Sequence, residues 1–246
     1  MSHVDEQIGR VMSTVRELGV RDNTLVVMHA DHGYQLGEHN EWEKKTNYEL
    51  AARVPLVISC PWLAASVGQK THVLAELVDI FPTLVSLVGL EPLGEFDGRG
   101  TDLSPVFSDP ASGAAFKNAS YTQYPVCTPV GWPARGFPSG SHSPHNPTCT
   151  SLAQTDMTKC NIHGCIAYGK NSFRKMGFSL RTDEWRYTAW VPWDGSRLLG
   201  SWSADFIEWP DDAEDRINRE LYDHRGDDGS VFDEYENENL AGAPQL

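Results

Sequence analysis

The feature that most constrains this fold is a short apolar run that ends in Asp31-His32-Gly33. The run, residues 24–29, is rich in β-branched and other apolar side chains, and it predicts a buried central strand of a parallel sheet. Ligands of open α/β sheets bind beyond the carboxyl ends of such strands, which is where Asp31 and His32 emerge. The alternative is an exposed turn, because Asp, His and Gly are common where a strand ends.

The side chains around this loop could hold both a metal ion and an anion. An Asp oxygen and a His nitrogen both bind divalent cations. The ammonium group of Lys44, further along the same loop, can hold an oxyanion. A cation and an ammonium group together suggest hydrolysis of a phosphate or sulfate ester. For Lys44 taken alone, the alternative is a solvated lysine within a run of charged residues.

The amino-acid sequence around these residues resembles that of a known family. Residues 30–44 resemble the second active-site block of type I sulfatases, most closely in the iduronate-2-sulfatase branch. The resemblance continues in the family's order through residues 53–58, 77–84, 121–125, 176–182, 186–188 and 220–223. It implies an α/β fold of the alkaline-phosphatase-like kind, in which helices flank a mixed sheet. A small antiparallel α+β subdomain is expected at the C-terminal end.

The resemblance also implies roles for individual residues. Asp31 and His32 stand where the family has two ligands of its calcium ion, with Mg²⁺ as the alternative cation. Lys44 stands where the family has a catalytic lysine that contacts the sulfate and stabilises charge on it. His39 and Trp42 are candidates for substrate binding. His39 could equally be a structural hydrogen bonder, and Trp42 could be packed in the wall of a pocket.

One part of the family's chemistry has no counterpart in these residues. The family's nucleophile is a formylglycine made from the Cys of a Cys-x-Pro-x-Arg motif. Residues 127–131 begin in the same way, but Gly131 stands where Arg is needed, and the segment follows the Asp-His-Gly block instead of preceding it. Cys127 is therefore not expected to be the nucleophile. The family's early acidic pair, lysine and histidine are missing as well.

The chain is accordingly expected to be the C-terminal half of a sulfatase. The formylglycine and the remaining metal ligands would lie in the N-terminal half of the same protein, which is needed for a complete site. We expect the isolated chain to be inactive. The expected function of the whole protein is hydrolysis of a sulfated saccharide such as a uronate 2-sulfate.

Composition excludes some other partners. The formal net charge is −14, from 20 basic and 34 acidic residues, and this argues against a nucleic-acid partner. A sulfated substrate is still compatible, because a metal ion and Lys44 can oppose the global charge locally. No apolar run approaches the ~20 residues that span a bilayer, and no signal-peptide pattern follows Met1.

Three consecutive regions are expected along the chain. Residues 1–108 alternate helical and strand patterns, as in the C-terminal half of a catalytic α/β domain. Residues 109–172 form an irregular insertion rich in Pro, Gly and Cys. Residues 173–246 form the small antiparallel subdomain. The expected elements are a helix over 4–18 that stops at Gly19, a strand at 55–59, a helix at 74–88 in which Pro82 starts a new turn, strands at 176–181, 186–191 and 220–223, and a turn at Asp194-Gly195.

Four of the five cysteines fall in the irregular region: Cys127, Cys149, Cys160 and Cys165. This clustering favours two disulfides, with three possible pairings. A zinc site that adds His142, His145 or His163 is an alternative, although no Cys-x-x-Cys spacing supports it, and free thiols are another. The fifth, Cys60, follows an apolar strand and is expected to be a free, buried thiol.

A glycosylation sequon agrees with the disulfide interpretation. Asn118-Ala119-Ser120 fits the acceptor pattern for N-glycosylation. Together, the cysteines and the sequon favour a lysosomal or secreted protein.

Two other functions remain open. A phosphodiesterase or phosphonate hydrolase of the same superfamily would share the Asp-His-Gly metal signature, but residues 36–39 together with Lys44 favour a sulfatase. A non-catalytic carbohydrate-binding remnant would explain the absence of a nucleophile.

Overall fold

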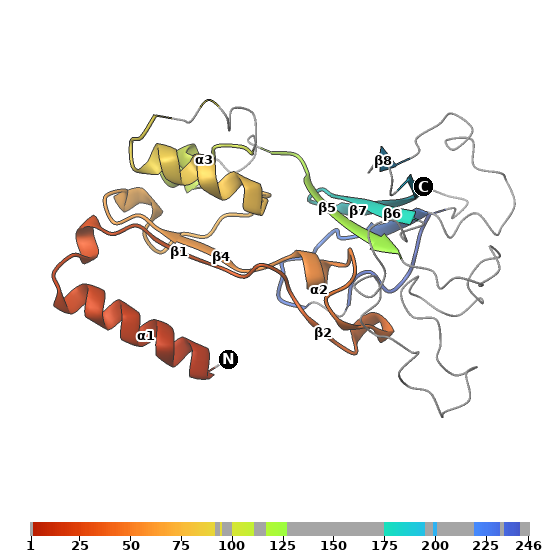
Figure 1. The fold of residues 1–246 in the computed structure, drawn as a ribbon, viewed down its shortest axis with the longest axis horizontal. Coiled ribbons are helices and arrows are strands. Elements are labelled where there is room, and N and C mark those ends of the chain that lie inside the picture. The colour runs from red at the N-terminus through yellow and green to blue at the C-terminus, as the bar shows by residue number, and fades with distance from the viewer. Residues whose placement is uncertain are drawn as a thin grey trace, which may run out of the picture. The chain divides into compact units, whose positions relative to one another are not determined.

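The computed structural model describes residues 2–91, 94, 100–110, 117–126, 175–194, 199–200, 219–231 and 234–241 (Figure 1). The chain divides into two compact units that interleave along the sequence. The first unit contains Met1–Asp31 and Pro55–Asn118, and the second contains His32–Val54 and Ala119–Leu246. The three consecutive regions expected from the sequence stay a prediction.

The helix predicted near the N-terminus is present in the first unit. α1 (Ser2–Glu17) is followed by Gly19, whose φ of +69° is a left-handed conformation that glycine adopts without strain. None of the helix residues is buried. Val4 and Val11 are 59% and 63% exposed, so the apolar stripe that predicted the helix has no covering among the described residues.

The predicted strands of the first unit are also present, but their pairing differs from the expectation. β1 (Val26–His29) pairs antiparallel with β4 (Leu56–Ser59), with Val26 opposite Ser59. The expectation that β1 would lie at the centre of a parallel sheet is therefore wrong for the described strands. Met28 of β1 is 40% exposed. Cys60 directly follows β4 and is a free, buried thiol, as predicted.

The second helix of the first unit, α3 (Leu77–Leu87), begins with a capping box made by Glu76 and Asp79. The helix continues through Pro82 without interruption, in agreement with the expectation of a single helix that contains this proline. The buried carboxylate of Asp79 accepts a hydrogen bond from the Thr101 N–H at 2.7 Å and pairs with the Lys117 ammonium at 2.6 Å. Three short 3₁₀ helices complete the described part of this unit: η1 (Arg21–Asn23), η3 (Ala64–Ser66) and η5 (Ser104–Phe107).

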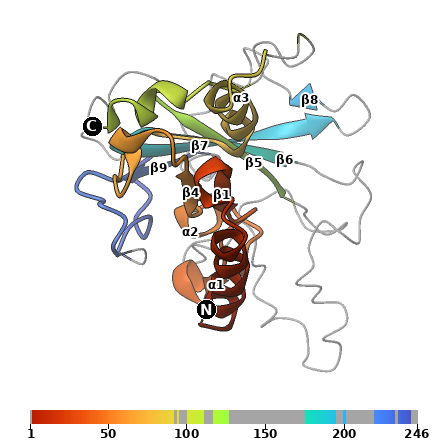
Figure 2. The same ribbon diagram turned by 90° about the vertical axis from the view of Figure 1, so that its left-hand side faces the viewer.

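An antiparallel sheet forms most of the second unit, as the sequence predicted for the C-terminal end. Its strand order is β5-β6-β7-β8, and β9 pairs with the remaining edge of β7, so that β5, β6, β7 and β9 lie side by side (Figure 2). The strands are β5 (Ser120–Val126), β6 (Lys175–Arg181), β7 (Trp185–Asp194), β8 (Leu199–Gly200) and β9 (Arg219–Asp223). The sequence analysis missed β5 and assigned its residues to an irregular insertion. Pro125 is tolerated there because β5 pairs only with β6 and so is an edge strand of the described sheet.

The two faces of this sheet differ in chemistry. Met176, Ala189 and Val191 share one face and form an apolar core cluster. The opposite face is polar and is internally hydrogen-bonded: the Thr188 hydroxyl lies 2.9 Å from that of Ser179, and Arg186 donates to the same hydroxyl at 3.2 Å.

Several predicted features lie outside the described residues. They are Cys127, Cys149, Cys160, Cys165, His142, His145, His163 and Gly195. Within the part of the chain that the structure describes, no helix combines the length and apolarity needed to cross a membrane.

Candidate active site

The candidate site lies on a segment of the second unit that we call the site loop, residues 32–54. A small hairpin shapes its first half, in which β2 (Gln35–Leu36) pairs antiparallel with β3 (Trp42–Glu43) around η2 (Glu38–Asn40). The turn requires unusual backbone angles, with a φ of +126° at Gly37 and of +56° at His39. A short helix, α2 (Glu49–Ala52), closes the second half.

The structure brings His32 and Lys44 together. The Nδ1 atom of His32 lies 2.8 Å from the Gly33 carbonyl oxygen, which can only accept, so Nδ1 carries the ring proton. The other ring nitrogen, Nε2, therefore keeps its lone pair, and it lies 2.6 Å from the Nζ atom of exposed Lys44. A carbonyl partner at one ring nitrogen is the usual arrangement when the other nitrogen ligates a metal.

Asp31 and Lys45 occupy different surroundings. Asp31 is exposed and is the last residue of the first unit, so the division between the two units falls between the two predicted metal ligands. Lys45 is paired with Glu43 at 3.2 Å, and its side chain is only 16% exposed. Of the two neighbouring lysines, Lys44 is the exposed one that faces His32.

The geometry of His39 is that of a structural hydrogen bonder. Its Nε2 atom donates to the Tyr235 carbonyl oxygen at 2.8 Å, and its Nδ1 atom accepts from the Gln35 amide at 3.2 Å. Its ring also stacks on Tyr48, with 4.8 Å between the ring centroids. Trp42, in contrast, is 64% exposed and is available to a ligand. Substrate binding by either residue stays a prediction.

Gly33 fixes the loop that carries His32. Its N–H donates to the Ala51 carbonyl of α2 at 2.9 Å. A Cβ atom at this position would lie 1.9 Å from the Leu50 carbonyl oxygen, which is far inside van der Waals contact. Only glycine therefore allows the strand exit and α2 to approach this closely.

A buried cluster of charges, which sequence reasoning missed, lies behind the site loop. The carboxylate of Glu49 pairs with Arg186, with Arg181 at 3.3 Å and with Arg53 at 3.4 Å. Burial alone raises the pKa of Glu49, but the guanidinium groups of Arg186 and Arg181 outweigh it and lower that pKa below 4.5. The available signal was the presence of arginines within strands that otherwise look suited to burial.

The same cluster contains three groups close enough to hold a metal ion, but its geometry favours ion pairing. Ligand atoms of Glu49, His224 and Asp227 lie within 4.8 Å of one another. The two ring nitrogens of His224 face Asp227 at 2.9 Å and Glu236 at 3.1 Å, and Arg181 contacts Asp227 at 3.3 Å. A cation would have to displace these hydrogen-bonded partners, so we interpret the cluster as structural.

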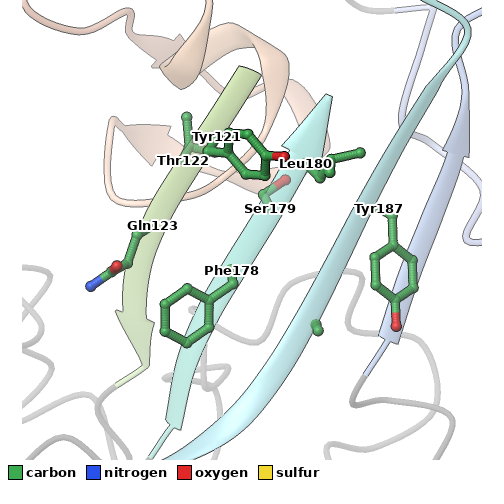
Figure 3. Close-up of a pocket in the computed structure, with 8 residues that line it drawn as sticks. Tyr121, Thr122, Gln123, Phe178, Ser179, Leu180 and Tyr187 are labelled. Atoms are coloured by element: carbon green, nitrogen blue, oxygen red, sulfur yellow. The ribbon is translucent and has the colours of Figure 1, made fainter. Parts of the chain in front are cut away.

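A shallow groove of about 420 Å³ lies on the sheet, away from these charges (Figure 3). Tyr121, Phe178, Leu180 and Tyr187 point into it from the apolar face of the sheet. None of the residues predicted from the sequence as site residues lines this groove.

Comparisons with known proteins agree with this fold and loop. The sulfatase family profile matches residues 1–90. Iduronate 2-sulfatase from Mus musculus is 29% identical over 244 residues, and the match covers 82% of this chain and 38% of the mouse protein. The chain thus spans well under half the length of this relative.

Two solved structures share the fold. The phosphonate monoester hydrolase from Silicibacter pomeroyi superposes with a TM-score of 0.58 at 24% identity, covering 98% of this chain and 35% of that protein. A protein in complex with its substrate D-glucosamine-2-N,6-O-disulfate gives a TM-score of 0.57 at 23% identity, covering 98% and 34%. Residues 1–90 therefore match the sulfatase family, and the chain shares the α/β fold of these two solved structures.

Proposed function

We propose that the protein hydrolyses sulfate esters of saccharides, with a uronate 2-sulfate as the leading substrate. The observation that supports this proposal is the short distance between the Nζ atom of Lys44 and the unprotonated Nε2 atom of His32. This pair joins a cation ligand to an anion-binding ammonium group. The names of the relatives support the substrate class, since they include an iduronate 2-sulfatase and a protein whose substrate is a disulfated glucosamine.

In this proposal each residue of the loop has a distinct task. Lys44 binds a sulfate oxygen and stabilises the negative charge that develops on it. Trp42, which is largely exposed, contacts the sugar. His39 holds the loop to the C-terminal segment through the Tyr235 carbonyl and acts on the substrate only through this placement.

Asp31 and His32 are the proposed ligands of a calcium ion, with magnesium as the alternative. The residues fit this role, because Asp31 offers exposed carboxylate oxygens and His32 has its Nδ1 proton engaged by a carbonyl. When bound there, such an ion would supply Lewis-acid polarisation of a sulfate oxygen. Calcium usually takes 6–8 oxygen donors, so we propose that other parts of the protein complete its shell and provide the formylglycine nucleophile.

An assay of sulfate release would test the proposed function. The complete protein, including the parts that provide the nucleophile and the remaining metal ligands, is expected to release sulfate from an iduronate 2-sulfate disaccharide in the presence of calcium, and chelation of the metal should abolish the release. The isolated chain should release none. Lys44→Ala should remove most of the activity, and Lys45→Ala is the matched control. Absence of sulfate release from every sulfated saccharide tested would refute the proposal and favour a carbohydrate-binding remnant.

A phosphonate monoester hydrolase is the second candidate, because one such enzyme shares the fold over 98% of the chain. A direct comparison of turnover rates on the two kinds of substrate distinguishes the two candidate functions. Faster turnover of a phosphonate monoester than of any sulfate ester would reverse our preference.

We also propose that the protein works in an oxidising compartment, either lysosomal or extracellular. Asn118, the acceptor of the sequon, is exposed and lies on a bend two residues before β5. When the protein is made in a secreting host, glycosidase treatment should lower its mass. The Asn118→Gln variant should show no such mass shift.

A further inference from the structure

A chain of backbone contacts joins α2 to the ring of His32. The Ala51 carbonyl accepts the Gly33 N–H at 2.9 Å, and the Gly33 carbonyl in turn faces the Nδ1 atom of His32 at 2.8 Å. The Leu50 carbonyl leaves no space for a Cβ at Gly33, which shows how closely the backbones of the two segments approach each other. Two successive contacts through Gly33 therefore connect α2 to the nitrogen of the imidazole ring that carries the proton.

α2 cannot hold its own position. It contains only four residues, and its N-cap residue Tyr48 makes no side-chain capping hydrogen bond. A helix of this length has no stability of its own in water. It is held from outside, since the Glu49 N–H donates to a carboxylate oxygen of Glu236 at 2.7 Å.

The side chain of Glu49 provides the second attachment. Its carboxylate pairs with Arg186 of β7 and with Arg181 of β6. Arg186 has only 3% of its side chain exposed, and it also contacts Glu236 at 2.5 Å. One buried guanidinium group thus bridges both groups that hold α2, and water is too scarce there to replace it.

We infer that Glu49 and Arg186 are positioning residues: through α2 and Gly33, their buried ion pair sets the orientation and tautomer of His32, and thereby its apposition to Lys44. Neither residue is required to touch the substrate. The C-terminal sheet then acts as the support of the active-site loop. This inference rests on the proposed function only for what His32 and Lys44 do, because the placement itself is a property of the fold.

Histidine NMR tests the placement without reference to activity. The protein is labelled with nitrogen-15 at its nine histidines, and the His32 signals are identified by their loss in His32→Gln. In the unaltered protein, the His32 signals should be those of a ring with a protonated Nδ1 atom and an unprotonated Nε2 atom. In Glu49→Gln and in Arg186→Lys we expect averaged signals from the two tautomers, because the ring has lost its fixed partner.

Arg225→Lys is the matched control for Arg186→Lys. Arg225 also belongs to the second unit and pairs with an aspartate, Asp223, but its side chain is 60% exposed. The control should leave the His32 signals and the activity unchanged. If Glu49→Gln does not fold, Arg186→Lys keeps the positive charge and provides the second test.

Enzyme kinetics provide a second test of the inference, and this test depends on the proposed function. We expect kcat for sulfate release to fall at least tenfold in Glu49→Gln, with partial recovery in Glu49→Asp, which restores the charge on a shorter side chain. Unchanged His32 signals in folded Glu49→Gln or Arg186→Lys protein would overturn the inference. If the unaltered protein releases no sulfate, the proposed function fails, and the NMR arm alone decides on the positioning.

Discussion

The Nε2 atom of His32 and the Nζ atom of Lys44 lie 2.6 Å apart. The single lone pair on Nε2 accepts the hydrogen bond from the ammonium group. A cation at Nε2 and the ammonium group compete for the same lone pair. An ion bound at Nε2 would therefore leave the ammonium group of Lys44 for another acceptor, such as a sulfate oxygen. Under the proposed function, the metal ion and the anion would therefore belong to one site, and this leads to the first two predictions.

Lys44→Ala is expected to reduce kcat/KM by roughly 2–4 kcal/mol of transition-state stabilisation, the scale for loss of one strong oxyanion donor. Lys44 is exposed, so the melting temperature should change little. Lys45→Ala, which removes a partner of Glu43 instead, should be nearly neutral for activity. Equal losses in the two variants, measured as sulfate release, would contradict the assignment of Lys44.

Asp31→Asn and His32→Gln are expected to weaken calcium binding and abolish turnover while the fold is retained. Asp31 is exposed, and His32 is only partly buried, so neither side chain is essential to the described core. Isothermal titration with CaCl₂ and far-UV circular dichroism measure the two properties separately. Calcium affinity equal to that of the unaltered protein in both variants would remove these residues from the metal site.

Gly33→Ala should lower the free energy of unfolding, because the new methyl group would overlap the Leu50 carbonyl oxygen. Gly9→Ala is the control, since a Cβ at Gly9 meets nothing within 4 Å and the residue lies inside α1. That control should stabilise the protein by about 0.5–1 kcal/mol. Urea titration of both variants measures the effects, and a neutral Gly33→Ala would show that the loop can shift.

Two buried carboxyl groups predict that stability falls as pH rises towards neutrality. Burial raises the pKa of Glu41 and of Glu220 from 4.5 to about 7. Below about pH 4.5 these groups are protonated in both states. Between 4.5 and about 7 the unfolded chain releases its protons first, so the folded state loses stability through this range.

Glu41→Gln and Glu220→Gln should each reduce this pH dependence, as measured by the melting temperature between pH 4.5 and 7.5. Asp223→Asn is the control, because the Arg225 side chain lowers the pKa of Asp223 to about 2 and its titration is complete below that range. A melting temperature that rises between pH 5 and 7 in the unaltered protein would contradict the prediction.

Alkylation should distinguish Cys60 from the other cysteines. Cys60 is 2% exposed, so it should react with iodoacetamide only after unfolding. Non-reducing peptide mapping of secreted material should give two bridges among the four cysteines Cys127, Cys149, Cys160 and Cys165. Four free thiols there would remove the argument for an oxidising compartment.

Local pattern was sufficient to predict most elements. The apolar stripe of α1 and the β-branched runs of β1 and β4 are properties of a few consecutive residues, and all three elements form where they were predicted. The pairing of β1 with β4 depends on which strand lies beside which, and periodicity carries no information about it. β5 was missed because polar residues and Pro125 hide its alternation, although it pairs with β6 along its whole length.

The candidate site also contains features that could be predicted from the sequence and features that could not. His32 and Lys44 are close in the sequence and form a recognisable block, so their contact could be predicted, whereas a shared metal site with Asp31 stays a prediction. The partners of Glu49 come from β6, β7 and the C-terminal segment, and no local pattern joins them. The buried cluster became visible only when the strands were placed side by side.

The distance along the chain between the site loop and its supports has a consequence for biosynthesis. The contact of His39 with Tyr235 spans 196 residues, and that of Glu49 with Glu236 spans 187. At typical rates of synthesis, the loop leaves the ribosome roughly 10–40 s before these partners exist. Contacts of such high sequence separation form late. The nascent chain therefore carries the Asp-His-Gly loop without its supports, and the loop can reach its final geometry only after Tyr235 and Glu236 have been synthesised.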